Sequence, residues 1–229
     1  WIGVASCVRL LGGNEEGFAA LQAAEPLARR FRAARELSEI HYYFGALRFA
    51  LGDIDGCLRH HADAHGFALT AQDAECEAQA LSGLGDAHYG RGRMRQAIDH
   101  FRRCQALCRE RGFGRIEVGS THMIGAIRRY LSEGEQALAD LRQAAATAAK
   151  VGNIRTQMVA LNILGEILVD AGRTAEARDT LLAALRLAED FANPRYRAYL
   201  LYELGRAHYY DPARRGEAPA VLSEALALC

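Results

Sequence analysis

Small, bulky and turn-forming residues recur along this chain at intervals of forty positions. We call the first small position of each repeat the anchor, and it is occupied by Ala5, Gly45, Gly85, Gly125, Gly165 and Gly205. A turn residue follows seven positions after each anchor, and further on a bulky residue stands between two small ones. Fixed offsets held over this many steps are typical of stacked helical repeats. Each repeat is therefore predicted to be two helices joined by a turn.

Close helix packing explains why the anchors are small. Two antiparallel helices approach to about 8 Å only where one of them has little or no side chain, while neighbouring positions supply Leu or Phe to fill the groove. Gly inside a helix costs about 1 kcal/mol relative to Ala, so Gly at most anchors indicates close crossings. The bulky position of each repeat is occupied by Leu21, His61, Phe101, Leu141, Leu181 and Leu222, the last after a one-residue insertion.

The turn signals place twelve helices. We expect them at residues 1–11, 15–33, 35–51, 54–70, 74–91, 94–111, 115–131, 134–151, 155–171, 174–191, 195–210 and 216–228. Ser132 and Glu135 have the spacing of a capping box, and Asn193 precedes Pro194 as a cap precedes a first-turn proline. The predicted fold class is all-α, a right-handed α-α superhelix of about six helical hairpins. We expect residues 1–229 to form a single domain.

The repeat resembles the tetratricopeptide repeat (TPR). Two stretches carry the resemblance: Leu84-Gly85 with Tyr89, Gly92, Ala97, Phe101 and Cys104, and Leu164-Gly165 with Gly172, Ala177, Leu181 and Ala184. The forty-residue period exceeds the usual TPR length of 34, the early Trp of the family is absent, and the closing Pro is rare. Repeats of this longer kind resemble the C-terminal regions of large bacterial signalling ATPases, of the cyclase-linked or transcription-regulator type. Both ends of the chain lack the polar outer face that terminal repeats need, so we expect a fragment of a longer protein.

Composition and charge are those of a soluble cytoplasmic module. The 28 basic residues balance 28 acidic ones, so no net field favours nucleic acid or an anionic membrane. No apolar run reaches the roughly 18 residues that a membrane span needs, and the start has no signal-peptide pattern. We therefore expect a cytoplasmic protein without direct nucleic-acid or membrane binding.

Motifs for catalysis or cofactor binding are not apparent in the sequence. A phosphate-binding P-loop cannot occur because Lys150 is the only Lys. His100, Cys104 and Cys108 have the i, i+4 spacing of zinc ligands, as do Cys57 and His61. Cys57 and Cys104 occupy small-residue positions, however, which favours packing over metal. His60, His61 and His65 are interpreted as solvated helix residues. No enzyme, cofactor or metal function is predicted.

One face of the first helices is the candidate binding surface. In TPR proteins the first helix of each repeat lines a concave groove, and the resemblance assigns to it positions three before and one, four and five after the anchor. The candidate residues, with Tyr199 added from the same face, are Tyr42, Phe49, Tyr89, His122, Arg129, Asn162, Glu166, Tyr199, Tyr202, Arg206, Tyr209 and Tyr210. Tyr and Arg are enriched at protein interfaces. Packing against neighbouring helices is the alternative for the tyrosines.

The functional prediction is a non-enzymatic protein-interaction or sensory module of a cytoplasmic bacterial signalling or transcription-regulatory ATPase. Its partner would be a protein, a peptide or another domain of the same chain, and apolar ends allow self-association. The alternative is a small-ligand sensor that controls an attached ATPase or nucleotide cyclase.

Overall fold

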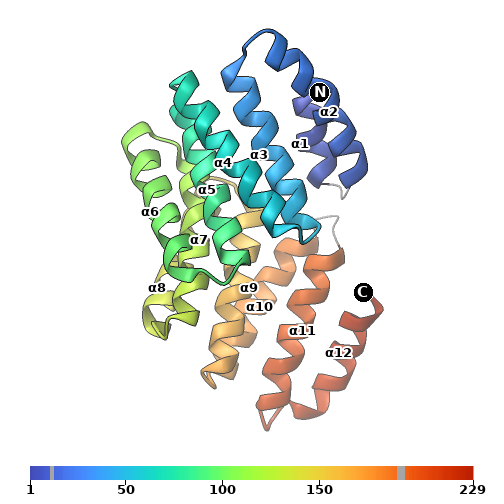
Figure 1. Cartoon of the computed structure of the whole chain (residues 1–229). Helices are drawn as coiled ribbons and strands as arrows, with labels where there is room; N and C mark the ends of the chain where they lie inside the picture. The colour runs from blue at the N-terminus through green and yellow to red at the C-terminus, as the bar shows by residue number, and fades with distance from the viewer. Residues whose placement is uncertain (11–12, 190–193, 229) are drawn as a thin grey trace. The chain divides into compact units, whose positions relative to one another are not determined.

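The computed structural model describes residues 1–10, 13–189 and 194–228, and this part of the chain is built almost entirely from helices (Figure 1). The α-helices are α1 (Ile2–Leu10), α2 (Asn14–Arg30), α3 (Ala34–Ala50), α4 (Ile54–Ala71), α5 (Ala74–Gly90), α6 (Met94–Arg111), α7 (Gly114–Tyr130), α8 (Gly134–Lys150), α9 (Ile154–Asp170), α10 (Thr174–Glu189), α11 (Pro194–Tyr210) and α12 (Ala218–Ala227). A short 3₁₀ helix, η1 (Arg215–Glu217), precedes α12. The all-α prediction is confirmed, and the expected helix ends agree with these bounds to within a turn.

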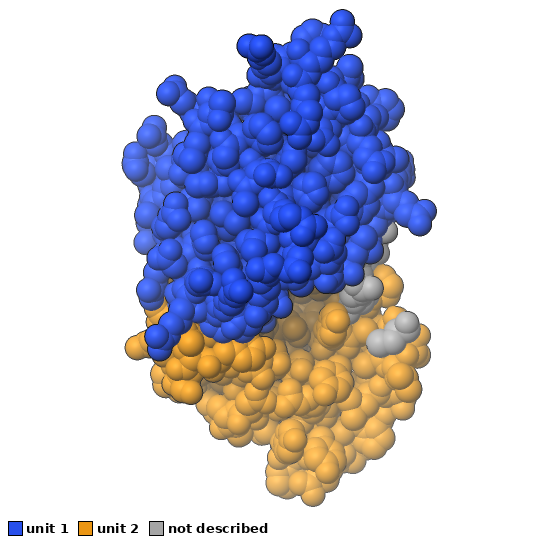
Figure 2. Space-filling model, viewed as in Figure 1, with its two compact units in different colours: residues 1–120 blue, residues 121–229 orange. Residues whose placement is uncertain are grey.

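The chain forms two compact units, residues 1–120 and 121–229, which divide within α7 (Figure 2). In unit 1, α1 packs on α2, α3 on α4 and α5 on α6. In unit 2, α9 packs on α10 and α11 on α12, and buried side chains of α8 to α12 form one continuous core. Each unit is thus a stack of helical hairpins. No helix in the described part of the chain combines the length and the apolar composition that crossing a membrane requires.

Every glycine anchor faces the bulky residue of the second helix in its own repeat. A Cβ atom added to Gly85 would lie 2.7 Å from the ring of Phe101, and one added to Gly125 would lie 2.7 Å from Cγ of Leu141. The same relationship pairs Gly45 with His61, Gly165 with Leu181 and Gly205 with Leu222. These separations leave no room for a side chain, so the anchors are glycine because the helices cross there.

Left-handed backbone recurs at the turn positions. Gly52, Gly92, Ser132 and Gly172 all have positive φ, seven residues after their anchors. Because Ser132 has φ 62° and lies just after the end of α7, it closes that helix and does not cap the next one. The capping-box interpretation of Ser132 with Glu135 was therefore wrong. Gly12 of the same column, and Asn193 before Pro194, lie outside the described residues.

Aspartate and asparagine cap three of the helices. Backbone N–H groups of Gly56, Cys76 and Thr156 donate to the side chains of Asp53, Asp73 and Asn153 over 2.8, 2.9 and 3.1 Å. Such caps satisfy donors that the first turn of a helix leaves without a backbone partner.

His61 is a core residue, which corrects the prediction of a solvated histidine. Its side chain lies between the anchor Gly45 of α3 and Gly83 of α5, both of which a Cβ would bring into collision with the imidazole. Burial lowers the pKa of His61 to about 3, so the ring is neutral at physiological pH. His61 thus fills the position that Leu141 and Leu181 fill in unit 2.

Candidate functional site

Five charged side chains form a continuous row across the first helices of unit 2. Arg129 of α7 contacts Glu166 and Asp170 of α9, with N–O distances of 2.5 and 2.6 Å. Asp170 also contacts Arg206 of α11 at 2.7 Å, and Arg206 contacts Glu203 at 2.8 Å. We call Arg129, Glu166, Asp170, Arg206 and Glu203 the charged row. Three of its members were candidate groove residues, and the structure brings them together through Asp170.

Burial and ion pairing shift the pKa values of the charged row in opposite directions. Burial lowers the pKa of Arg206 and hydrogen bonds to Asp170 and Glu203 raise it, with a net upward shift. Burial likewise lowers the pKa of Arg129, and Glu166 and Asp170 raise it, again with a net upward shift. Glu203 is the most buried member, and burial raises the pKa of its carboxyl against the opposing charge of Arg206. The row is therefore a charged, partly exposed surface in which each carboxylate has an arginine partner.

Tyrosines on α7 and α11 are exposed near the charged row. Tyr202 is 50% exposed, and Tyr199, Tyr210 and Tyr130 are exposed to a similar degree. Their exposure differs from that of Val169, a lining position on α9 that is only 3% exposed. Half-exposed tyrosine rings retain large apolar area that a partner can cover.

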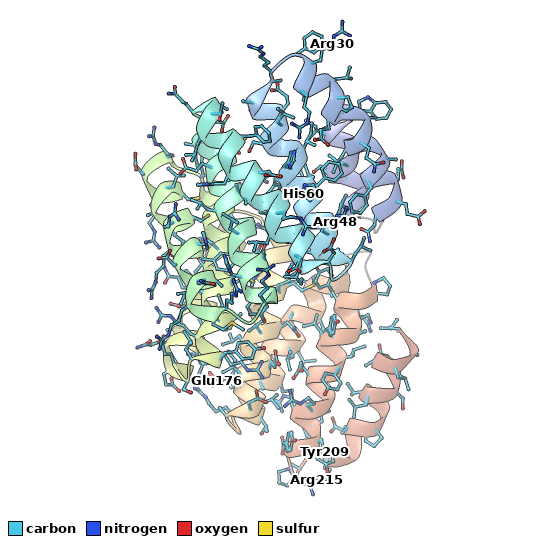
Figure 3. The ribbon with its side chains drawn as sticks, viewed as in Figure 1. Arg30, Arg48, His60, Glu176, Tyr209 and Arg215 are labelled. Atoms are coloured by element: carbon cyan, nitrogen blue, oxygen red, sulfur yellow. The ribbon has the colours of Figure 1, made fainter. Side chains whose placement is uncertain are left out.

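Tyr209 has different surroundings from the other tyrosines. It occupies the repeat position of the buried Val169, yet it is exposed and lies under the guanidinium of Arg215, whose Cζ is 5.6 Å from the ring centroid (Figure 3). Arg215 also donates to the carbonyl oxygen of Tyr209 over 3.0 Å. Tyr209 and Tyr210 contact one another edge to face. Tyr209 thus lies on the same side of α11 as Tyr202, seven residues earlier, but against the side chain of Arg215.

The remaining candidates are more enclosed. In unit 2, His122 of α7 and Asn162 of α9 are half-buried, and Oδ1 of Asn162 has no hydrogen-bond partner among the described residues. In unit 1, Tyr42 packs beside the core His61, with ring centroids 5.5 Å apart. Phe49 is near Gly90, and Tyr89 is half-buried. Unit 1 therefore offers less exposed aromatic surface at these positions than unit 2.

Four of the cysteines in the described part of the chain are packing residues. Cys57, Cys76, Cys104 and Cys108 are all buried, and the Sγ atoms of Cys104 and Cys108 lie 3.9 Å apart. Burial and nearby carboxylates raise the pKa of Cys57 to about 12, so its thiol stays protonated at neutral pH.

Unit 1 contains a histidine pair that the sequence did not predict. His41 of α3 and His60 of α4 face each other, and Asp63 lies beside them, with the ligand atoms of all three within 4.8 Å of one another. Burial lowers the pKa of both imidazoles. His60 was interpreted as a solvated residue, but its ring stacks on Phe44 with a centroid separation of 5.0 Å. The sequence held no signal for this cluster, because His41 belongs to the preceding helix.

Comparison with known proteins identifies the architecture. No protein-family model and no curated protein sequence matches the chain. Similar structures include a Rap conjugation gene regulator of the plasmid pLS20 in complex with the Phr* peptide, with a TM-score of 0.79, 15% identity, and coverage of 96% of this chain and 61% of the regulator. The chain has a tetratricopeptide-repeat-like fold.

Two further TPR-like neighbours differ in how much of their own length the match covers. BtubC from P. vanneervenii has a TM-score of 0.74 at 16% identity, with 96% of this chain and 90% of that one covered. A signal transduction ATPase with numerous domains (STAND) from Pyrococcus horikoshii, described as having a tetratricopeptide repeat sensor, has a TM-score of 0.71 at 14% identity. The match covers 97% of this chain and 35% of the ATPase. At these identities the likeness establishes the fold alone.

Proposed function

We propose that the chain is a non-enzymatic interaction module whose unit 2 binds a protein or peptide through the charged row and the tyrosines next to it. The observation that carries the proposal is the alternation of charge along the row, from Arg129 through Asp170 to Arg206. An extended peptide presents backbone donors and acceptors in alternation, so a surface with both signs of charge suits it better than a single-sign patch. Tyr202 and Tyr210 would supply the apolar contact area.

The neighbours support a peptide or protein partner. The plasmid regulator was determined with a peptide bound, and the ATPase carries its repeats as a sensor. Together with the resemblance of the sequence, they favour a regulatory module of a cytoplasmic bacterial signalling or transcription-regulatory ATPase. The groove candidates of unit 1, Tyr42, Phe49 and Tyr89, would have a supporting role because their side chains are more enclosed than the tyrosines of α11.

Peptides selected from a random library against the parent chain provide the test. Tyr202→Ala and Arg206→Ala should each weaken the binding of the selected peptides by more than about 1 kcal/mol, as truncation of interface anchors does. Tyr202→Ala should leave the fold intact, because the Tyr202 ring is half exposed. Arg206→Ala should lower the free energy of unfolding without unfolding the protein, because the carboxyl of Glu203, whose pKa burial already raises, can take up a proton when its arginine partner is removed. Circular dichroism and the urea midpoint would confirm the intact fold.

Arg142→Ala is the matched control. Arg142 of α8 also forms an interhelical ion pair, with Glu176 of α10 at 2.8 Å. It lies on the second helix of its repeat, however, whereas the charged row lies on the first helices. Its removal should leave peptide binding unchanged. Equal binding by the parent, Tyr202→Ala and Arg206→Ala would refute the proposed surface.

A further inference from the structure

Two imidazoles and a carboxylate that have no part in the proposed peptide-binding surface converge in unit 1. His60 and Asp63 are three residues apart on α4 and so share a helix face. His41 of α3 meets them from the adjacent helix. Within residues 1–10, 13–189 and 194–228, no other set of three His, Cys, Asp or Glu side chains brings its ligand atoms as close.

The distances between the ligand atoms match a tetrahedral metal site. Nδ1 of His41 lies 3.2 Å from Nδ1 of His60 and 3.3 Å from Oδ2 of Asp63. Metal–nitrogen and metal–oxygen bonds of about 2.0–2.1 Å in a tetrahedron put neighbouring ligand atoms about 3.3–3.4 Å apart. Two of the three separations are therefore already at the edge length that such an ion requires, and all three ligand atoms lie within 4.8 Å of one another.

A hydrogen bond alone satisfies the cluster poorly. One proton on Nδ1 of His41 would have two competing acceptors, the His60 nitrogen and the Asp63 oxygen. A single cation at the centre would instead accept a lone pair from each of the three atoms. The chemistry of the donor set thus favours an ion over a shared proton.

Neighbouring aromatic rings hold the two imidazoles in place. His41 packs against Phe67, with ring centroids 5.2 Å apart, and His60 stacks on Phe44. The side chain of His41 is only 5% exposed, whereas that of Asp63 is 58% exposed. The ligands are therefore restrained on the core side, and the solvent side remains open for a water molecule as fourth ligand.

A carboxylate also lies behind the buried imidazole. Oε1 of Glu25 is 3.5 Å from Nε2 of His41, on the opposite side of the ring from Nδ1. Metal-bound histidines commonly have a carboxylate at the second nitrogen, which fixes the tautomer that leaves the first nitrogen free to bind. Nearby arginines are already paired, Arg29 with Glu25 and Arg48 with Asp53.

We propose that His41, His60 and Asp63 bind a divalent transition-metal ion of the zinc, cobalt or nickel class. Two imidazole nitrogens and one carboxylate oxygen suit these ions, whereas Mg²⁺ and Ca²⁺ prefer ligand sets made of oxygen. The site joins α3 to α4, so metal binding would stabilise the hairpin of the second repeat.

Titration of the chelator-treated 229-residue chain with Co²⁺, followed by competition with Zn²⁺, tests the proposal. We expect saturable binding of one Co²⁺ per chain, with the strong visible absorption of a four-coordinate ion and no near-ultraviolet thiolate band. His60→Gln and Asp63→Asn should each weaken binding at least tenfold. Glu25→Gln should weaken it by a smaller factor, because Glu25 acts only through His41.

His65→Gln is the matched control, because His65 is on the same helix and half-buried but outside the cluster. It should bind Co²⁺ as the parent does. Circular dichroism of each variant would verify the fold; His41 is left unchanged because it is buried. The proposal is overturned by the absence of saturable binding, by a thiolate band that places the ion at Cys104 and Cys108, or by unchanged affinity in both His60→Gln and Asp63→Asn.

Discussion

Leu181 of α10 occupies the space that a side chain on Gly165 of α9 would need. A Cβ added to Gly165 would lie 2.6 Å from both Cγ and Cδ2 of Leu181, well inside van der Waals contact. Cγ is the branch point of the leucine, so a rotation of its methyl groups cannot relieve the collision. The crossing of the two helices in this repeat therefore depends on glycine.

Gly165→Leu should destabilise the protein by about 1–3 kcal/mol or more, because it overpacks this crossing. Gly165→Ala should be milder but still destabilising. The urea midpoint measures both effects. Since repeats couple mainly to their neighbours, hydrogen exchange should rise first in α9, α10 and the helices beside them.

Gly66→Ala is the control for this prediction. Gly66 lies inside α4, and a Cβ there would meet no atom within 4 Å. The change should stabilise the protein by up to about 1 kcal/mol through helix propensity alone. The register assigned to the repeats would be refuted if Gly165→Ala and Gly66→Ala shifted the midpoint in the same direction.

Ser132 and Gly172 occupy equivalent left-handed turns, with φ of 62° and 73°. Residues other than glycine pay about 1–2 kcal/mol for this conformation. Ser132→Gly should therefore raise the free energy of unfolding by about 1 kcal/mol, and Gly172→Ser should lower it by a similar amount. Reciprocal shifts of the urea midpoint would confirm the turn geometry, whereas two shifts of the same sign would contradict it.

The stacked rings of His88 and His100 predict a loss of stability in acid. Their centroids are 5.1 Å apart, and burial lowers the pKa of each imidazole. The charged or titratable groups near His88 are Arg91 and Arg93. Those near His100 are Asp99, Arg103 and His65. A histidine whose pKa is lower in the folded state gains its proton first in the unfolded chain. Stability should therefore fall as the pH drops below about 6.5.

His100→Gln should reduce that loss. Both proteins would be compared by urea unfolding at pH 8 and at pH 5.5. At pH 8 the histidines are neutral, so any difference there reports packing alone. A parallel decline of parent and variant between the two pH values would show that this pair does not contribute.

Cysteine reactivity should follow burial. Cys7 is exposed, whereas burial and neighbouring carboxylates raise the pKa of Cys57 to about 12 and that of Cys76 to about 11. Because the thiolate is the reactive form, iodoacetamide at pH 8 should label Cys7 much faster than Cys57 or Cys76. Peptide mass spectrometry would read each site separately, and denatured protein, in which all sites react, is the control. Equal labelling of Cys7 and Cys57 in the native protein would contradict the prediction.

Sequence periodicity was a good guide to the backbone. The anchors, the turns at Gly52, Gly92 and Gly172, and the helix bounds were all predicted from columns of small and turn-forming residues, and the structure adds that these turns are left-handed. These features are local or repeat with fixed spacing, so each repeat supplies independent evidence for the same geometry. Ser132 shows the limit: its side chain also fits a helix cap, and only the backbone φ in the structure distinguishes a helix-ending residue from a capping residue.

Side-chain partnerships between helices required the tertiary structure. The meeting of His41 with His60, the burial of His61 against Gly45 and Gly83, and the link from Arg129 through Asp170 to Arg206 join residues of different helices. Such contacts depend on the rotamers and on the crossing of each helix pair, which the spacing of residues along the chain does not specify. The sequence by itself determined where the helices run and where they must cross closely; packing decided which polar side chains are buried together and which remain exposed to a partner.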